Sequence, residues 1–255
     1  MQKAILKYVL KACIRDRLIL SLLVATVVAV SLSVFIGSSA VTEQDQFVMV
    51  FIASSLRYLY VIGITLFIAF YCIRMKDTRE LDFLLTRPVT RVQYVISHGA
   101  VFLVLALFFS AIVTGLLSGI FYKKFEVSFL IWGFSFFGEL LIVTYLAYFF
   151  SMVLKSVVTA ALSTLAFYTF SKIIGQILGI VHDPLTGGDR PFLSAMMEAI
   201  SLVVPRLDLF TQNEWLLYGA GEGATQIFLI LFVQTALFGS VLIAATCIDL
   251  LRRDF

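Results

Sequence analysis

The stretch "LILSLLVATVVAVSLSVFIG", residues 18–37, contains no charged side chain. A helix of this length rises by about 30 Å, which is the thickness of the hydrocarbon core of a bilayer. The composition of the rest of the chain agrees, since 61% of its 255 residues are hydrophobic and 14% are charged. A soluble domain has about a quarter of its residues charged. The sequence therefore predicts an integral membrane protein.

Five further stretches of comparable length and composition follow along the chain. We expect the six membrane spans at 18–37, 47–73, 95–121, 129–153, 157–181 and 226–248. A transmembrane β-barrel would show short segments of strict alternation between apolar and polar residues, and the sequence has none. We therefore expect an all-α fold in which residues 1–255 form a single transmembrane domain.

The basic residues are divided unevenly between the two sides of these spans. Most lie before the first span, in the loop 74–94 and in the C-terminal tail. The opposite side holds only Lys123, Lys124, Arg190 and Arg206. Because lysine and arginine accumulate on the cytoplasmic side, we expect both termini to face the cytoplasm. The expected location is the inner (cytoplasmic) membrane of the cell.

Two segments outside the spans are too apolar for simple loops. In residues 2–16, basic residues recur every four positions opposite an apolar face, which is typical of a helix lying at the membrane interface. Residues 182–225 form the last outer segment, where we expect short helices that re-enter the membrane or lie on it. Trp132 and Trp215 fall at outer span boundaries, where indole rings commonly anchor in the interface.

The charged stretch "RMKDTRELDFLLTRPVTR", residues 74–91, separates the second and third spans. Asp77 and Glu80 have the spacing of a capping box that opens a helix. The apolar positions that follow share one helical face: Leu81, Leu84 and Leu85. Pro88 disfavours the helical conformation at the residue before it. We therefore expect a short amphipathic helix at 78–86.

A helix this short is marginal on its own and must pack against something. The membrane surface and a cytoplasmic protein are the two candidate partners. A helix that binds only anionic lipid would be uniformly basic, so the mixture of acidic and basic side chains favours a protein partner.

Three motifs together resemble the ABC-2 type permease family, the transmembrane subunits of ABC exporters. They are "RELDFLLTRPVTRVQYVISHGA" (79–100), "VVPRLDLF" (203–210) and "DLLRRDF" (249–255), and the resemblance also covers the six spans and the N-terminal helix. In the first motif, the family's two leucines, small residue, proline, aliphatic residue and arginine correspond to Leu84, Leu85, Thr86, Pro88, Val89 and Arg91. Many relatives carry a Gly-Thr pair where this chain has Arg79, Glu80 and Leu81.

The resemblance implies that the 78–86 helix docks into a groove of a separate ABC ATPase subunit. The residues expected at that contact are Asp77, Arg79, Glu80, Leu81, Leu84, Leu85, Arg87 and Arg91. It also implies a second permease subunit, identical or different, to complete a dimer in membrane lipid. The resemblance places ATP and magnesium on that ATPase subunit, and the absence of a GxxxxGK[ST] loop for nucleotide phosphates in this chain is consistent with this expectation.

Catalytic chemistry is not indicated. His98 and His182 fall on opposite sides of the membrane, and no cysteine–histidine spacing points to a metal site. We expect no catalytic residue, no metal or cofactor bound by this chain, and no nucleic-acid partner. The alternatives to an exporter subunit are a secondary transporter, a channel or a non-catalytic membrane subunit.

Three ionisable residues, Arg57, Glu139 and Lys172, lie near the middle of their spans. Each costs on the order of 2.5–3.5 kcal/mol at the bilayer centre, so their similar depth suggests that they meet. They would either form an ion pair that fixes helix packing or line a path that attracts an anionic head group. Glu139→Ala is expected to harm folding more than Arg57→Ala, because it leaves two cations without a counter-charge.

Overall fold

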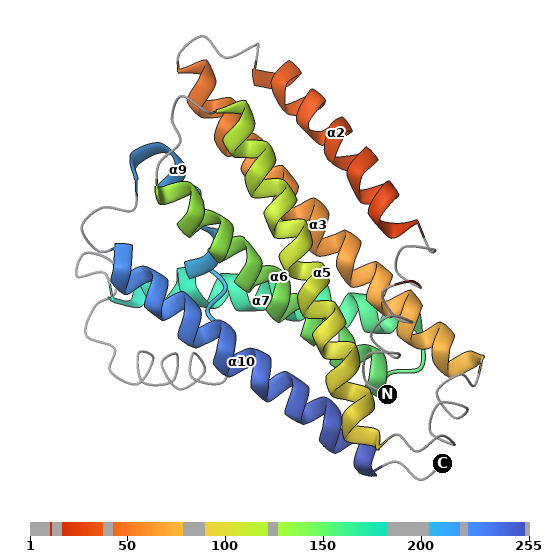
Figure 1. The fold of residues 1–255 in the computed structure, drawn as a ribbon. Helices are drawn as coiled ribbons and strands as arrows, with labels where there is room; N and C mark the ends of the chain where they lie inside the picture. The colour runs from red at the N-terminus through yellow and green to blue at the C-terminus, as the bar shows by residue number, and fades with distance from the viewer. Residues whose placement is uncertain are drawn as a thin grey trace.

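The computed structural model describes residues 17–37, 43–78, 90–121, 127–182, 204–219 and 224–252, together with Lys11. Six long helices dominate these residues, and no strand occurs among them (Figure 1). They are α2 (Leu18–Gly37), α3 (Gln44–Asp77), α5 (Arg91–Ile120), α6 (Val127–Val153), α7 (Val157–His182) and α10 (Ala224–Arg252). All six are long and apolar enough to cross a membrane, so the chain is a multi-span helical membrane protein, as the sequence predicted.

Helices α3, α5 and α10 each extend at least four residues beyond one end of their predicted spans, α10 at its C-terminal end, Arg252. Helix α3 continues through charged residues to Asp77 and has 34 residues, which gives a length of about 51 Å. Helix α5 begins at Arg91, because Thr90 and Gln93 form a reciprocal capping box. The boundaries predicted from the apolar runs missed these extensions, since a helix continues beyond an apolar run wherever its backbone hydrogen bonds remain satisfied.

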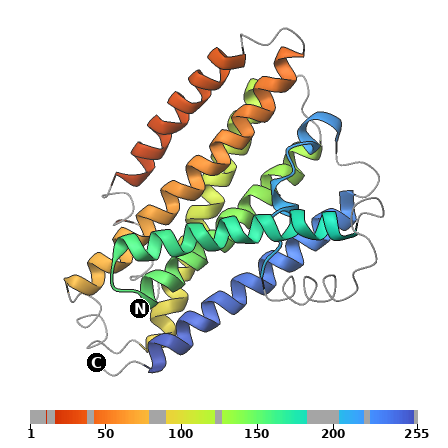
Figure 2. The same ribbon diagram turned by 180° about the vertical axis from the view of Figure 1, so that it is seen from behind.

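The two ends of the bundle are distinct. At one end α3 ends, α5 begins, α6 turns into α7, and α10 ends; we call this the 78–90 end (Figures 1 and 2). At the opposite end, α6 begins and the segment 204–219 lies against it; we call this the 204–219 end. The predicted helix at 78–86 falls almost entirely outside the described residues, as does the interfacial helix at 2–16 apart from Lys11.

Helix α6 is the centre of the bundle. It packs against α3, α5, α7 and α10, and most of its side chains are buried. Helix α2, by contrast, lies at the edge against α3 and exposes much of its apolar surface (Figure 1). A polar residue on α6 is therefore surrounded by protein, whereas α2 faces the lipid.

The segment 204–219 folds back onto the bundle through the short 3₁₀-helix η2 (Leu209–Thr211) and the one-turn helix α9 (Trp215–Tyr218). Phe210 is fully buried against Gly138 of α6, where a Cβ atom would lie 2.5 Å from the Phe210 ring. Such a close approach requires glycine. The short helices expected before the last span are thus present in the described part of this segment.

Trp132 and Trp215 were expected to anchor in the membrane interface, but both side chains are buried inside the protein. Trp132 is 0% exposed and Trp215 is 6% exposed. Both indoles lie where the segment 204–219 packs on α6, so protein rather than lipid head groups surrounds them.

Candidate functional site

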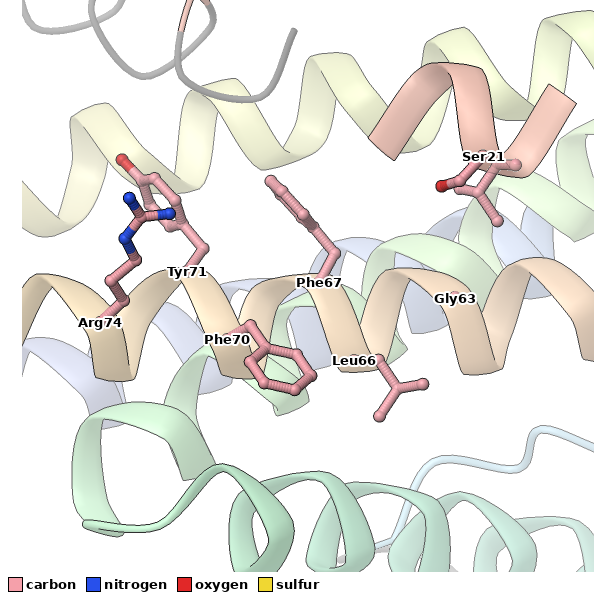
Figure 3. Close-up of a pocket in the computed structure, with 8 residues that line it drawn as sticks. Ser21, Gly63, Leu66, Phe67, Phe70, Tyr71 and Arg74 are labelled. Carbon is pink, nitrogen blue, oxygen red and sulfur yellow. The ribbon is translucent and has the colours of Figure 1, made fainter. Parts of the chain in front are cut away.

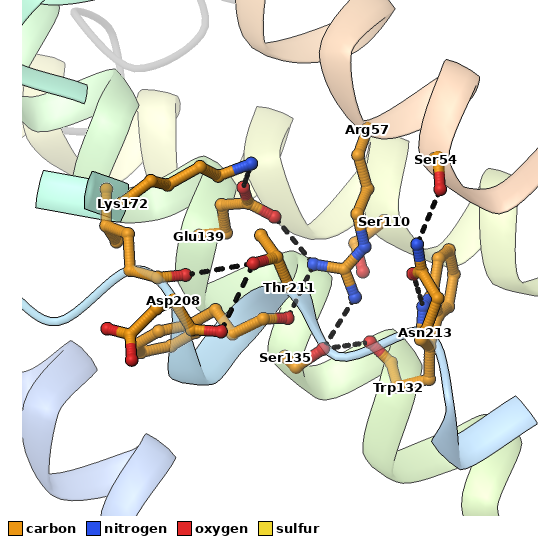
Figure 4. Close-up of polar contacts among 12 residues, drawn as sticks. Ser54, Arg57, Ser110, Trp132, Ser135, Glu139, Lys172, Asp208, Thr211 and Asn213 are labelled. Carbon is orange, nitrogen blue, oxygen red and sulfur yellow. Dashed lines mark hydrogen bonds and ion pairs between the residues drawn. The ribbon is translucent and has the colours of Figure 1, made fainter. Parts of the chain in front are cut away.

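Arg57, Glu139 and Lys172 meet inside the bundle (Figure 4). Arg57 Nη1 of α3 lies 2.6 Å from Glu139 Oε2 of α6, and Lys172 Nζ of α7 lies 3.4 Å from Glu139 Oε1. The contact expected from their similar depth is therefore confirmed, and it involves both cations at once. One carboxylate on the central helix joins three helices.

Arg57 is almost completely buried and is bound on several sides. Its guanidinium also donates to Ser135 Oγ at 2.8 Å and to the backbone carbonyl oxygen of Phe210 at 2.6 Å. Its Cζ atom lies 4.6 Å from the centre of the Trp132 ring, a cation–π contact. Arg57 therefore ties α3 both to α6 and to the re-entering segment 204–219.

Glu139 is the most enclosed member, with 0% exposure. Besides the two cations, the Tyr168 hydroxyl donates to Oε1 at 2.7 Å. A buried carboxylate is tolerated when it is paired and hydrogen-bonded, and each oxygen of Glu139 has a partner. Sequence reasoning missed Tyr168 and Ser135, because hydroxyl side chains are common in apolar helices and only their place in the fold distinguishes these two.

Lys172 is held more loosely than Arg57. Its distance to Glu139 exceeds the 2.7–2.9 Å that is typical of a charge-assisted hydrogen bond. Its ammonium group lies over the rings of Tyr58 and Tyr168, at 4.4 and 4.6 Å from their centres. Its side chain is 15% exposed, which places it at the boundary between the buried network and an adjoining cavity.

This cavity, of about 400 Å³, lies between α3, α7 and the segment 204–219. We call it the polar cavity. Its lining residues are Ser54, Arg57, Tyr58, Lys172, Gly175, Gln176, Asp208, Thr211, Gln212 and Asn213. Most of these side chains are polar. Because they come from three separate elements, the cavity exists only when α3, α7 and the segment 204–219 are packed together.

Two contacts fix the segment 204–219 as one wall of the polar cavity. The side chain of Asn213 accepts from Trp132 Nε1 at 2.8 Å and donates to Ser54 Oγ at 2.7 Å, which bridges α6 and α3 (Figure 4). Asp208 packs directly on Gly175 of α7, where a Cβ atom would lie 1.9 Å from the Asp208 carboxyl carbon. No motif in the sequence pointed to Asn213 or Asp208, since both lie in a segment without helical periodicity.

A second cavity, of about 510 Å³, lies between α2 and α3 (Figure 3). Leu66, Phe67 and Phe70 of α3 form much of its wall, and Arg74 stands at one end. Helix α2 comes close to α3 here, because Gly63 faces the Leu22 side chain. The lining of this cavity is mostly apolar, and Ser21, Tyr71 and Arg74 are its polar residues.

Of the eight residues predicted to contact the ATPase, the structure describes Asp77 and Arg91. Arg79, Glu80, Leu81, Leu84, Leu85 and Arg87 lie outside the described residues. Asp77, which the spacing indicates as the residue that opens the short helix, is instead the last residue of α3. Arg91 is the first residue of α5, and it donates to the carbonyl oxygens of Leu250 and Leu251 at 3.1 and 3.2 Å.

The helix on the other side of the charged stretch is held in a similar way. Lys76 of α3 donates to the carbonyl oxygens of Ser151 and Leu154, where α6 ends. Cations stabilise helix C-termini, because the last carbonyl groups lack backbone partners and carry partial negative charge. Two cations near the ends of the charged stretch, Lys76 and Arg91, thus hold the C-terminal ends of α6 and α10.

Among the described residues, no group of three His, Cys, Asp or Glu side chains is arranged to hold a metal ion. Cys72 and Cys247, the cysteines in the described part of the chain, form no disulfide there. In comparisons with known proteins, no protein-family model and no curated sequence matched the chain.

Proposed function

We propose that this chain is the transmembrane permease subunit of an ATP-binding cassette exporter. The observation that supports it best is the pair of contacts made by Lys76 and Arg91. Each lies near one end of the charged stretch 74–91, and each holds the end of another helix. A force applied to this stretch would therefore act on α6 and α10 as well as on α3 and α5.

A displacement of the charged stretch would spread through helix α6, because α6 contacts α3, α5, α7 and α10. It also carries Glu139, to which Arg57 and Lys172 are bound. Packed helices move as rigid bodies with discrete arrangements rather than bending continuously. Movement at the 78–90 end would change the Glu139 network and the polar cavity near the 204–219 end.

The remaining parts of the proposal follow from the family resemblance. The 78–86 helix docks on an ABC ATPase subunit, which binds ATP and magnesium, and two permease subunits pair in the membrane. In this proposal the 78–90 end and both chain termini lie on the cytoplasmic side of the inner membrane, which the uneven distribution of basic residues supports. The polar cavity then opens toward the outer side.

The test is co-purification in detergent from the native membrane. Wild type is compared with the double variant Leu81→Asp, Leu84→Asp, which adds two negative charges to the apolar face of the proposed docking helix. The control is Lys155→Asp, which makes the same change in net charge in the exposed turn between α6 and α7. An ATP-hydrolysing subunit should accompany wild type and the control, and should be lost from the double variant.

Two results contradict the proposal. If the ATPase remains with the double variant, the 78–86 helix is not the docking element. If no ATPase accompanies folded, monodisperse wild type, the chain is better explained as a secondary transporter, a channel or a non-catalytic membrane subunit. The buried network of Arg57, Glu139 and Lys172 would then be its polar centre.

A further inference from the structure

We propose that the polar cavity is a binding site for an anionic group, a carboxylate or a phosphate, and that the ammonium group of Lys172 is its principal contact. All the groups involved belong to this chain and lie near the 204–219 end. The inference therefore stands whether or not an ATPase docks at the other end of the bundle.

The charges around the cavity leave a positive excess. Glu139 supplies one negative charge to two cations, and its shorter contact is with Arg57. The other carboxylate at the cavity, Asp208, lies 3.1 Å from the guanidinium of Arg206. Counting these five groups, three cations face two anions. Glu139 and Asp208 are both engaged by arginines, so Lys172 is the cation with the least compensated charge.

The position of Lys172 makes this charge accessible. Arg57 is enclosed by Ser135, Phe210 and Trp132, whereas Lys172 is partly exposed at the cavity wall. The rings of Tyr58 of α3 and Tyr168 of α7 contact the ammonium group. A cation in a cleft with low-dielectric walls attracts anions more strongly than a cation on an open surface.

Two side chains at the rim of the polar cavity can donate hydrogen bonds to an anion. Gln176 of α7 and Gln212 of the segment 204–219 both line the cavity with exposed amide side chains. An amide N–H donates to a carboxylate or phosphate oxygen without adding charge. A volume of about 400 Å³ lies within the usual range for small-molecule sites. An ammonium group of α7, together with amide donors from α7 and from the segment 204–219, therefore makes a site for one anionic group.

The occupant could arrive from two sources, as a soluble anion or as the head group of an anionic lipid, and two probes separate them. The first probe is inorganic phosphate, titrated into detergent-purified protein at constant ionic strength. Tryptophan fluorescence is the readout, because both tryptophans of the chain, Trp132 and Trp215, lie where the segment 204–219 packs on α6. The second probe is a nanodisc of phosphatidylglycerol compared with one of phosphatidylcholine, read by thermal unfolding.

Two variants test the site, and each has a matched control. Lys172→Gln removes the proposed contact, and Lys155→Gln removes a lysine charge at the opposite end of the bundle. Gln176→Glu adds a negative charge at the exposed rim and leaves Lys172 and Glu139 intact, so it should fold. Gln44→Glu makes the same exchange at the exposed start of α3.

We expect saturable phosphate binding, or a higher unfolding temperature in phosphatidylglycerol than in phosphatidylcholine. In Lys172→Gln and Gln176→Glu, the phosphate affinity should fall by at least about tenfold, or the lipid difference should disappear. The two controls should behave as wild type. A response to phosphate identifies a soluble anion, and a response only to phosphatidylglycerol identifies a lipid head group. If neither probe has an effect, or if Gln176→Glu responds as wild type does, the inference is wrong.

Discussion

Replacing Glu139 by glutamine should destabilise the protein severely, although glutamine has nearly the same shape. At an effective dielectric constant of 20, unit charges 2.6 Å and 3.4 Å apart attract by roughly 6 and 5 kcal/mol. Glu139→Gln removes both attractions, while the structure no longer has to bury a carboxylate, which offsets several kcal/mol. The expected net loss is about 3–5 kcal/mol, the usual cost of leaving a buried charge without its partner.

Arg57→Met should cost less. Glu139 keeps Lys172 and the Tyr168 hydroxyl as partners, so no carboxylate is left uncompensated. The lost attraction to Glu139 is largely offset because the buried guanidinium no longer has to be desolvated. The lost donor to the Phe210 carbonyl oxygen then costs about 1–3 kcal/mol. The double variant should be more stable than Glu139→Gln alone, because it no longer contains an unpaired guanidinium.

Thermal unfolding in a maltoside detergent measures these differences. Each kcal/mol shifts the midpoint by about 2–4 °C in a chain of this size, so Glu139→Gln should lower it by roughly 6–20 °C. The coupling between the two sites should be about 1–3 kcal/mol in a double-mutant cycle. If the losses simply add, or if Arg57→Met is the more damaging change, then Glu139 does not hold the network together through charge.

Three further predictions concern the other contacts that shape the bundle. Gly175→Ala should destabilise the fold by about 1–3 kcal/mol, because the new methyl group collides with the Asp208 carboxyl, whereas Gly115→Ala has open space and should be neutral or slightly stabilising. Thermal unfolding of the two alanine variants side by side checks this difference. Asn213→Ala should cost about 1–3 kcal/mol and speed proteolysis of the segment 204–219, since it removes the bridge between α3 and α6; an unchanged cleavage rate would contradict it. Lys76→Met should cost about 1–2 kcal/mol by freeing the end carbonyls of α6, and its unfolding midpoint compared with wild type measures this.

For Arg57, Glu139 and Lys172, the sequence predicted the depth in the membrane but not which contacts they make. Their equal depth followed from span positions, because a charged residue far from either end of an apolar run must lie near the bilayer centre. The sequence could not show that both cations share one carboxylate, or that Phe210 supplies a carbonyl oxygen to Arg57. Those contacts depend on which helices are neighbours.

The sequence by itself determined that this is a helical membrane protein and where its spans lie, because spanning a bilayer is a local requirement on each twenty-residue stretch. Only the tertiary structure decided that α6 occupies the centre, that α2 lies at the edge, and that the segment 204–219 buries Trp132 and completes the polar cavity. Lipid is as apolar as the side chains, so hydrophobicity does not choose helix neighbours. Close packing at small residues such as Gly138 and Gly175, together with buried polar contacts, makes that choice.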